Sequence, residues 1–107
     1  MVDSDEFRVT VRRGARAAGR TIVAHVQLGP FEGPTHVGFV VSKAVGNSVV
    51  RNRVKRKLRH VARGRVDGLP RGTRLVVRAL PASATASSDE LAADLMSALD
   101  RATAGHR

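Results

Sequence analysis

The sequence predicts a small α/β domain, an α+β sandwich with elements in the order helix, strand, strand, helix, strand, helix. Apolar residues repeat with the helical period in the stretches 50–62 and 91–102. The stretches 21–28, 37–42 and 74–80 alternate apolar with polar residues or run apolar, as strands do. A strand, a helix and a strand follow one another mid-chain, which indicates a crossover between parallel neighbours.

Length and composition predict one domain covering residues 1–107, with a tail at 104–107 that we expect to fray. The chain has no cysteine, which excludes disulfides, thiolate metal sites and cysteine nucleophiles. Its acidic start, MVDSDEF, is unlike a secretory or transit signal. No apolar run approaches the roughly 18 residues that a membrane span needs. We therefore expect a cytoplasmic protein without a membrane partner.

The first predicted helix is short. Asp3 or Ser4 can cap its start and Gly14 can end it. Phe7 and Val11 lie four residues apart and therefore share one face of this helix.

The strand predicted at 21–28 has two distinct faces. One face carries Ile22, Ala24, Val26 and Leu28, and the other carries Val23, His25 and Gln27. His25 therefore belongs to a base-stacking surface or is simply exposed. A turn with two prolines follows at 29–34, and the more apolar stretch 37–42 is expected to form a central strand.

The helix predicted at the middle of the chain is strongly basic. Asn47 or Ser48 can cap it, and it is expected to stop near Gly64. Its apolar stripe consists of Val50, Val54, Leu58, Val61 and Ala62. The last helix begins with a capping box from Ser87 to Glu90, and its stripe is Leu91, Leu95, Leu99 and Ala102.

Charge gives the clearest indication of function. Between residues 43 and 65 there are nine Lys or Arg and no Asp or Glu. Most charge runs are solvated faces, but such helices gain stability by interleaving Glu with Lys, and here like charges repel. The net charge of +10 and pI of about 11.8 favour a nucleic-acid partner. An anionic membrane is disfavoured because this helix has no Trp or Phe on its apolar side.

The start of the basic helix is a candidate phosphate site. Asn47, Ser48, Arg51 and Asn52 cluster where backbone N–H groups are free and the helix dipole is positive. Asn52 either contacts a ribose hydroxyl or base edge, or takes a buried capping role. No catalytic motif or metal-ligand spacing of histidines occurs, so we expect no chemistry from this chain alone.

The central part of the chain resembles the signature of a known family. It reads VGFVVSK at 37–43, VGN at 45–47 and VRNRVKRKLR at 50–59. Weaker matches occur at 6–7, 13–14, 19–20 and 78–82. Together these stretches resemble the bacterial ribonuclease P protein subunit.

The resemblance implies a ribosomal protein S5 domain 2-like fold, with a left-handed crossover through the basic helix against the usual right-handed rule. It implies a partner, the catalytic ribonuclease P RNA, which with Mg²⁺ bound mainly by RNA removes the 5′ leader of precursor tRNA. The protein would be a non-catalytic cofactor of this endonuclease, monomeric within the ribonucleoprotein. The leader would lie in a cleft between the first helix and the sheet.

The resemblance also assigns residues. The expected RNA-binding residues are Lys43, Asn47, Arg51, Asn52, Arg53, Lys55, Arg56, Lys57 and Arg59. The expected leader-cleft residues are Phe7, Val11, Arg12 and His25. Phe7 matches a cleft aromatic, whereas Val11 and His25 replace aromatic residues usual in the family, so leader stacking is expected to be weaker or differently tuned.

Two other functions fit the residues. One is a general or ribosome-associated RNA-binding protein, which would bind precursor and mature tRNA alike. The other is a helix-turn-helix DNA-binding protein, which requires a second packed helix after residue 70 rather than a strand.

Overall fold

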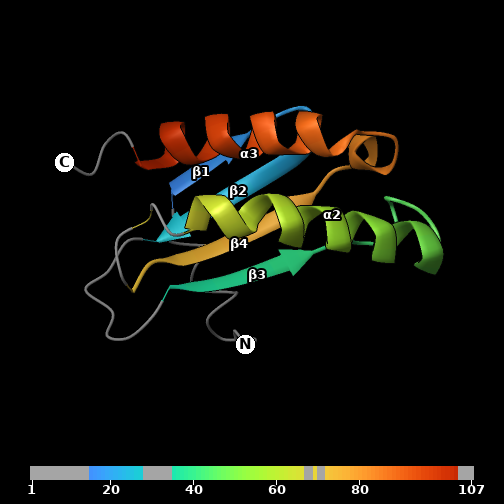
Figure 1. Cartoon of the computed structure of the whole chain (residues 1–107), viewed down its shortest axis with the longest axis horizontal. Helices are drawn as coiled ribbons and strands as arrows, with labels where there is room; N and C mark the ends of the chain where they lie inside the picture. Colours follow the sequence, from blue (N-terminus) through green and yellow to red (C-terminus); the bar gives the residue numbers. More distant parts are fainter. Residues whose placement is uncertain (1–14, 28–34, 67–68, 70–71, 104–107) are drawn as a thin grey trace.

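The computed structural model describes residues 15–27, 35–66, 69 and 72–103 (Figure 1). The elements are β1 Ala15–Ala18, β2 Ile22–Gln27, β3 His36–Val40, α2 Ser48–Val66, β4 Arg74–Ala79, the 3-10 helix η1 Pro81–Ala84 and α3 Ser88–Thr103. The helix predicted near the N-terminus, with Phe7, Val11 and Arg12, lies outside the described residues. So does the tail at 104–107.

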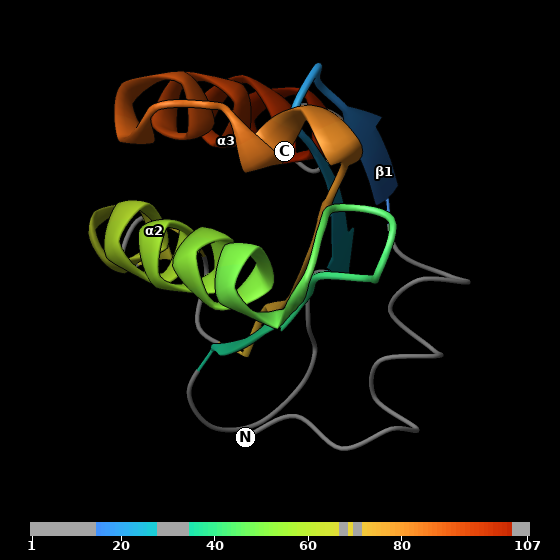
Figure 2. The same cartoon turned by 90° about the vertical axis from the view of Figure 1, so that its right-hand side faces the viewer.

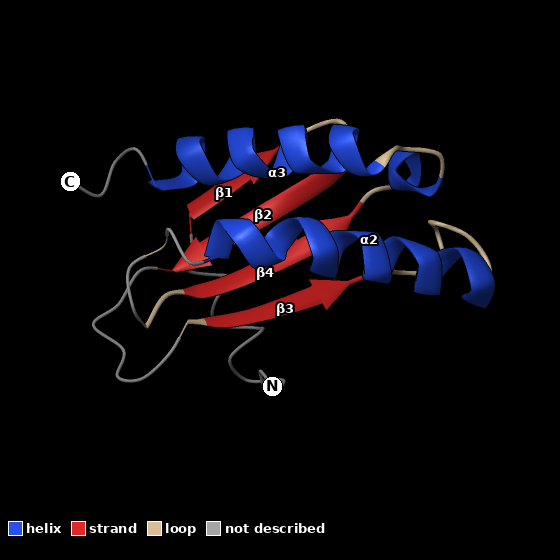
Figure 3. Ribbon diagram, viewed as in Figure 1, coloured by secondary structure: helices blue, strands red, loops and turns tan. Residues whose placement is uncertain are grey.

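The described elements form two layers. The sheet has the order β1-β2-β4-β3, with β3 and β4 parallel and the other pairs antiparallel. Helices α2 and α3 pack against each other and cover the same face of the sheet, as Figures 2 and 3 show. Neither α2 nor α3 covers the opposite side of the sheet, and with respect to these two described helices we call it the helix-free face.

The connection from β3 through α2 to β4 is the predicted crossover between parallel neighbours. Figure 1 shows β3 and β4 running in the same direction with α2 in front of them, and the chain turns from β3 to β4 in the left-handed sense. The left hand implied by the family resemblance is therefore confirmed. Because residues 74–79 form a strand, the helix-turn-helix alternative is wrong.

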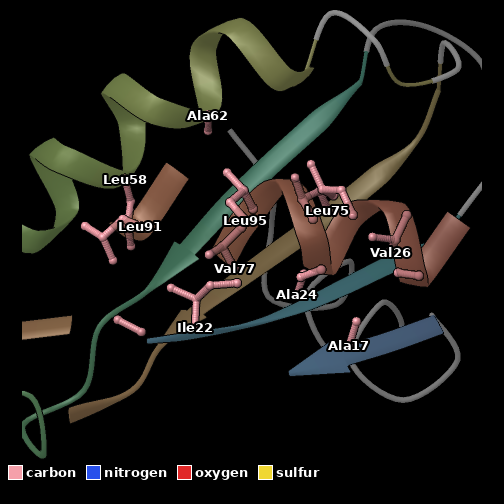
Figure 4. Close-up of a cluster of buried hydrophobic side chains, with 14 of the residues drawn as sticks. Ala17, Ile22, Ala24, Val26, Leu58, Ala62, Leu75, Val77, Leu91 and Leu95 are labelled. Atoms are coloured by element: carbon pink, nitrogen blue, oxygen red, sulfur yellow. The ribbon is translucent and has the colours of Figure 1, made fainter. Parts of the chain in front are cut away.

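The core lies between the sheet and the two helices (Figure 4). Val54, Leu58 and Ala62 of α2 are buried, and Val50 and Val61 pack at its edge, so the predicted stripe is confirmed. The stripe of α3 is buried along its whole length. The sheet contributes Ala17, Ile22, Ala24, Val26, Leu75, Val77 and Ala79.

Both helix starts are capped by side chains. The Asn47 Oδ1 accepts a hydrogen bond from the Val50 N–H at 3.0 Å, so Asn47 rather than Ser48 caps α2. Gly46 precedes this cap, and a Cβ there would lie 2.9 Å from the Val50 side chain, which explains the glycine. In α3 the predicted capping box is confirmed, since Ser87 and Glu90 exchange two hydrogen bonds of 3.1 Å.

Two features differ from the sequence predictions. The stretch 37–42 was expected to form a central strand, but β3 lies at the edge of the sheet. Its apolar residues Val37 and Phe39 pack at the rim of the core instead. Strand β1 was not predicted, because its sequence ARAA lacks the branched and aromatic residues that favour strands. It forms by pairing with β2 at the edge of the sheet. Helix α2 ends at Val66, near Gly64 as predicted. A Cβ at Gly64 would meet nothing, so this glycine weakens the helix by about 1 kcal/mol relative to alanine.

Candidate nucleic-acid interface

The Lys and Arg residues of α2 and the preceding turn form a surface that we call the cationic ridge. Its members are Lys43, Arg51, Arg53, Lys55, Arg56, Lys57, Arg59, Arg63 and Arg65. Arg51, Lys55 and Lys57 are half-buried and the others are exposed. The apolar stripe of α2 faces the core, so the amphipathic period of the helix directs this charge outward.

The described part of the chain leaves the ridge without a counter-charge. One ion pair is seen among the described residues, between Arg20 and Glu90, and neither residue belongs to the ridge. The described carboxylates all lie on α3. Repulsion along α2 is therefore uncompensated within this part of the molecule, and a polyanion would relieve it.

Two ridge residues are held by the fold. The Lys57 Nζ donates a hydrogen bond of 3.2 Å to the Ala86 carbonyl, in the segment between η1 and α3. The Arg51 Nε is buried and has no hydrogen-bond partner. An unpaired buried donor is costly, so a change in the Arg51 side chain that brings this N–H an acceptor would be favourable.

A hollow of about 300 Å³ opens where α2 passes the start of α3. Its lining residues are Arg53, Arg56, Lys57, His60 and Ser88. None of the described residues that line it is acidic. His60 and Ser88 were not predicted as site residues, because only the packing of α3 against α2 brings Ser88 to the ridge.

The two asparagines at the start of α2 have different roles. Asn47 is exposed but its side-chain oxygen is engaged in the cap. Asn52 is exposed, so the buried capping role considered for it is wrong. Its amide therefore lies on the surface beside the ridge, where it can donate to and accept from a ligand.

His25 occupies the helix-free face of the sheet. Ile22, Ala24 and Val26 of β2 join the helix-side core, so the alternating His25 side chain points the other way. It is only 3% exposed, and the expectation that it might be simply exposed is wrong. Neither ring nitrogen has a hydrogen-bond partner.

The environment of His25 disfavours its protonated form. Burial lowers the pKa of His25 below its ordinary value, and the nearby positive charges of Arg78 and Arg16 lower the pKa further. At neutral pH the ring is therefore uncharged. Phe7, Val11 and Arg12, predicted to share a cleft with His25, lie outside the described residues.

Among the residues that the structure describes, no group of three or more His, Cys, Asp or Glu side chains could hold a metal ion. No helix in the described ranges is long and apolar enough to cross a membrane.

Comparison with known proteins assigns the family. A family model described as Ribonuclease P matches residues 1–103. The chain belongs to the ribonuclease P protein family. The ribonuclease P protein component from a Nocardioides species is 55% identical over 95 residues, which cover 87% of this chain and 81% of the relative. That from Corynebacterium diphtheriae is 49% identical over 106 residues, covering 92% and 88%.

Solved structures of ribonuclease P proteins share the fold. The protein from Staphylococcus aureus superposes with a TM-score of 0.82 at 22% identity, covering 95% of this chain and 93% of its own. The protein from Thermotoga maritima superposes with a TM-score of 0.75 at 20% identity, covering 89% of both chains. The two-layer arrangement is therefore that of the ribonuclease P protein family.

Proposed function

We propose that this chain is the protein subunit of ribonuclease P, the ribonucleoprotein endoribonuclease that removes the 5′ leader from precursor tRNA. Its partners are the ribonuclease P RNA and the precursor tRNA. The observation that carries this function is the cationic ridge without a described counter-charge, in a chain that belongs to the ribonuclease P protein family. The catalytic step belongs to the RNA, and the protein contributes binding.

The ridge is the proposed contact for the ribonuclease P RNA. Arg53, Arg56 and Arg59 are exposed on α2, and arginine binds phosphate through two parallel hydrogen bonds. Lys43, Asn47, Arg51, Asn52, Lys55 and Lys57 complete the proposed RNA-binding set. The half-buried Arg51 supports this assignment, because its Nε lacks a partner within the protein.

The helix-free face is the proposed contact for the leader. His25 lies in this face with two unpaired ring nitrogens, and a single-stranded RNA offers bases, ribose hydroxyls and phosphates to such a group. Phe7, Val11 and Arg12 complete the proposed cleft from the sequence. We further infer that the chain acts as a monomer within a cytoplasmic ribonucleoprotein, with Mg²⁺ bound mainly by the RNA.

The test compares precursor and mature tRNA. The ribonuclease P RNA is assayed at roughly physiological Mg²⁺ with and without this chain, using leader-bearing substrate and mature tRNA as a competitor. We expect the chain to raise the cleavage rate and to strengthen binding of leader-bearing RNA relative to mature tRNA. Equal strengthening of both RNAs would instead indicate a general RNA-binding protein and would overturn the proposal.

A variant separates the two surfaces. His25→Ala is expected to weaken binding of the leader more than binding of the ribonuclease P RNA. Equal losses for the two RNAs would remove His25 from the leader contact.

A further inference from the structure

The helix-free face contains a buried polar side chain that the fold leaves unsatisfied. His25 is 3% exposed, and both Nδ1 and Nε2 lack a hydrogen-bond partner. Most buried polar groups in proteins are paired, because leaving one unpaired costs about 1–3 kcal/mol. An unpaired buried imidazole in a binding face indicates a ligand that supplies the missing partner.

The sheet register places two arginines beside this imidazole. Arg16 of β1 stands directly opposite His25 of β2, and Arg78 of β4 stands opposite Val23, one diagonal step from His25. Directly opposed side chains have Cβ atoms about 5 Å apart, and diagonal neighbours about 7–8 Å. Both arginines are exposed, and each alternates with residues of the helix-side core, so their side chains share the helix-free face with His25.

No described negative charge balances this group. The described carboxylates belong to α3, on the other side of the sheet. Among the described residues, the other charged or titratable side chains of this face are Arg74 of β4 and His36 of β3, which stand opposite each other in the sheet register. Two guanidinium groups repel a metal cation and attract an anion. Phosphate is the anion that single-stranded RNA presents at every nucleotide.

We propose that Arg16, His25 and Arg78 form a proton-linked binding site for a phosphate of the RNA leader. This inference rests on the proposed leader contact at the helix-free face. The phosphate is held between the two guanidinium groups and accepts a hydrogen bond from the imidazole. On binding, the imidazole takes one proton from solvent and becomes a charged donor; no covalent bond forms or breaks.

The direction of the linkage follows from the charges. In the free protein burial and the charges of Arg78 and Arg16 lower the pKa of His25. A bound RNA phosphate places one negative charge among these groups, which offsets part of the positive charge of the arginines, so the pKa of His25 rises. Leader affinity therefore increases as pH falls. Binding is compared at a pH below the pKa of His25 in both the free and the bound protein and at a pH above both pKa values. Each unit by which binding raises the pKa makes binding about tenfold tighter at the lower pH.

The first test observes His25 in the unmodified protein. The imidazole protons are titrated by NMR without ligand, with inorganic phosphate, and with a single-stranded RNA of leader sequence. We expect the titration of His25 to move to higher pH with both ligands. If RNA leaves the titration of His25 unmoved, the site is not a leader phosphate site.

The second test measures affinity in the holoenzyme. The affinities of the holoenzyme for mature tRNA and for precursor tRNA with a non-cleavable linkage at the scissile bond are measured at pH 5.5 and 7.5. The quantity compared is the ratio of the affinity for precursor tRNA to the affinity for mature tRNA. For the unmodified chain we expect this ratio to be several-fold larger at pH 5.5. For His25→Gln, which cannot titrate, we expect a ratio independent of pH. For the control Ser97→Gln, at an exposed position of α3, we expect the pH dependence of the unmodified chain.

The outcomes separate the two proposals. If the unmodified holoenzyme shows no preference for precursor tRNA at either pH, the leader contact itself fails and the site fails with it. If the preference is present but the same at both pH values, or equally pH-dependent in His25→Gln, the proton-linked site fails while the leader contact stands.

Discussion

Individual residues of this domain are placed by a few polar contacts between α3 and the β1–β2 hairpin. The Asp94 Oδ2 accepts hydrogen bonds from both the backbone N–H, at 3.0 Å, and the hydroxyl of Thr21. The Arg101 Nη2 donates a bond of 2.9 Å to the Ala18 carbonyl. These contacts fix the turn that connects β1 to β2, and thereby the position of Arg16 beside His25.

Removal of the Asp94 carboxylate tests this anchoring. Thr21 is fully buried, so Asp94→Ala leaves its N–H and hydroxyl without their acceptor. We expect the free energy of unfolding to fall by about 1–3 kcal/mol, as measured by urea denaturation. The control is Asp100→Ala on the same helix, an exposed position where a change within about 0.5 kcal/mol is expected. Equal effects at the two positions would show that the anchor contributes nothing.

His25 is expected to make folding stability depend on pH. Its pKa is lowered in the folded protein from the ordinary value of 6.5, because of burial and then of Arg78 and Arg16. Above pH 6.5 the ring is neutral in both states and contributes nothing. As pH falls below 6.5 the unfolded chain takes up the proton first, so the free energy of unfolding decreases until the folded-state pKa is passed.

This dependence is measured by urea denaturation at pH 7.5 and 5.5. We expect the stability lost on acidification to be smaller in His25→Gln than in the unmodified chain. The matched control Asn52→Gln, at an exposed position of α2, introduces the same side chain without removing an imidazole and should lose as much as the unmodified chain. A pH dependence that His25→Gln leaves intact would assign the effect to other groups.

At the scale of elements, α2 combines a buried stripe with an exposed basic surface. Arg53→Ala and Arg56→Ala alter only the surface, so we expect the free energy of unfolding to change by no more than about 0.5 kcal/mol. Binding to the ribonuclease P RNA should weaken, and each variant should flatten the slope of log affinity against log salt by about 0.7–0.9. Arg20→Ala removes the same charge outside the ridge and should leave the slope unchanged. Unaltered slopes in the ridge variants would contradict the phosphate contacts.

The hollow between α2 and α3 would add a second element to the proposed RNA contact. Ser88 lines it together with Arg53, Arg56, Lys57 and His60. Ser88→Asp introduces a carboxylate among these basic groups, and we expect RNA affinity to fall several-fold while the helix remains folded, since an acid in the first turn of a helix is favourable. Ser97→Asp adds the same charge to an exposed position near the other end of α3 and is expected to have a smaller effect. Equal losses would mean that the hollow does not receive RNA.

At the scale of the molecule, the core holds α2 against the sheet. The stability of the fold is therefore linked to the proposed RNA binding by the cationic ridge on α2. Leu58 of α2 is fully buried in the core that α2 forms with the sheet and α3 (Figure 4). Leu58→Ala should lower the free energy of unfolding by about 2–5 kcal/mol, measured by thermal or urea denaturation. Val49→Ala on the same helix, where the side chain is 65% exposed, should change it by less than about 0.5 kcal/mol. Similar losses in the two variants would contradict the orientation of α2.

Much of the architecture could be predicted from sequence because periodicity reports burial. The stripes from Val50 to Ala62 and from Leu91 to Ala102, the positions of three strands along the chain and the capping box were predicted and are confirmed. The central place predicted for the stretch 37–42 is wrong, because the apolar content of a strand does not report its order in the sheet. The ridge was predicted for the same reason, since charges that alternate with a buried stripe must face outward. The left hand of the crossover came only from the family resemblance, because local periodicity carries no information on handedness.

The sequence by itself determined which faces are apolar, where the positive charge lies and which helix carries it. Only the tertiary structure decided which residues from distant segments become neighbours. Strand β1 forms although its residues favour no strand, and its pairing with β2 sets Arg16 opposite His25. The packing of α3 on α2 sets Ser88 beside the ridge. Contacts of this kind depend on how elements pair and pack in space, and no local pattern in the chain encodes them.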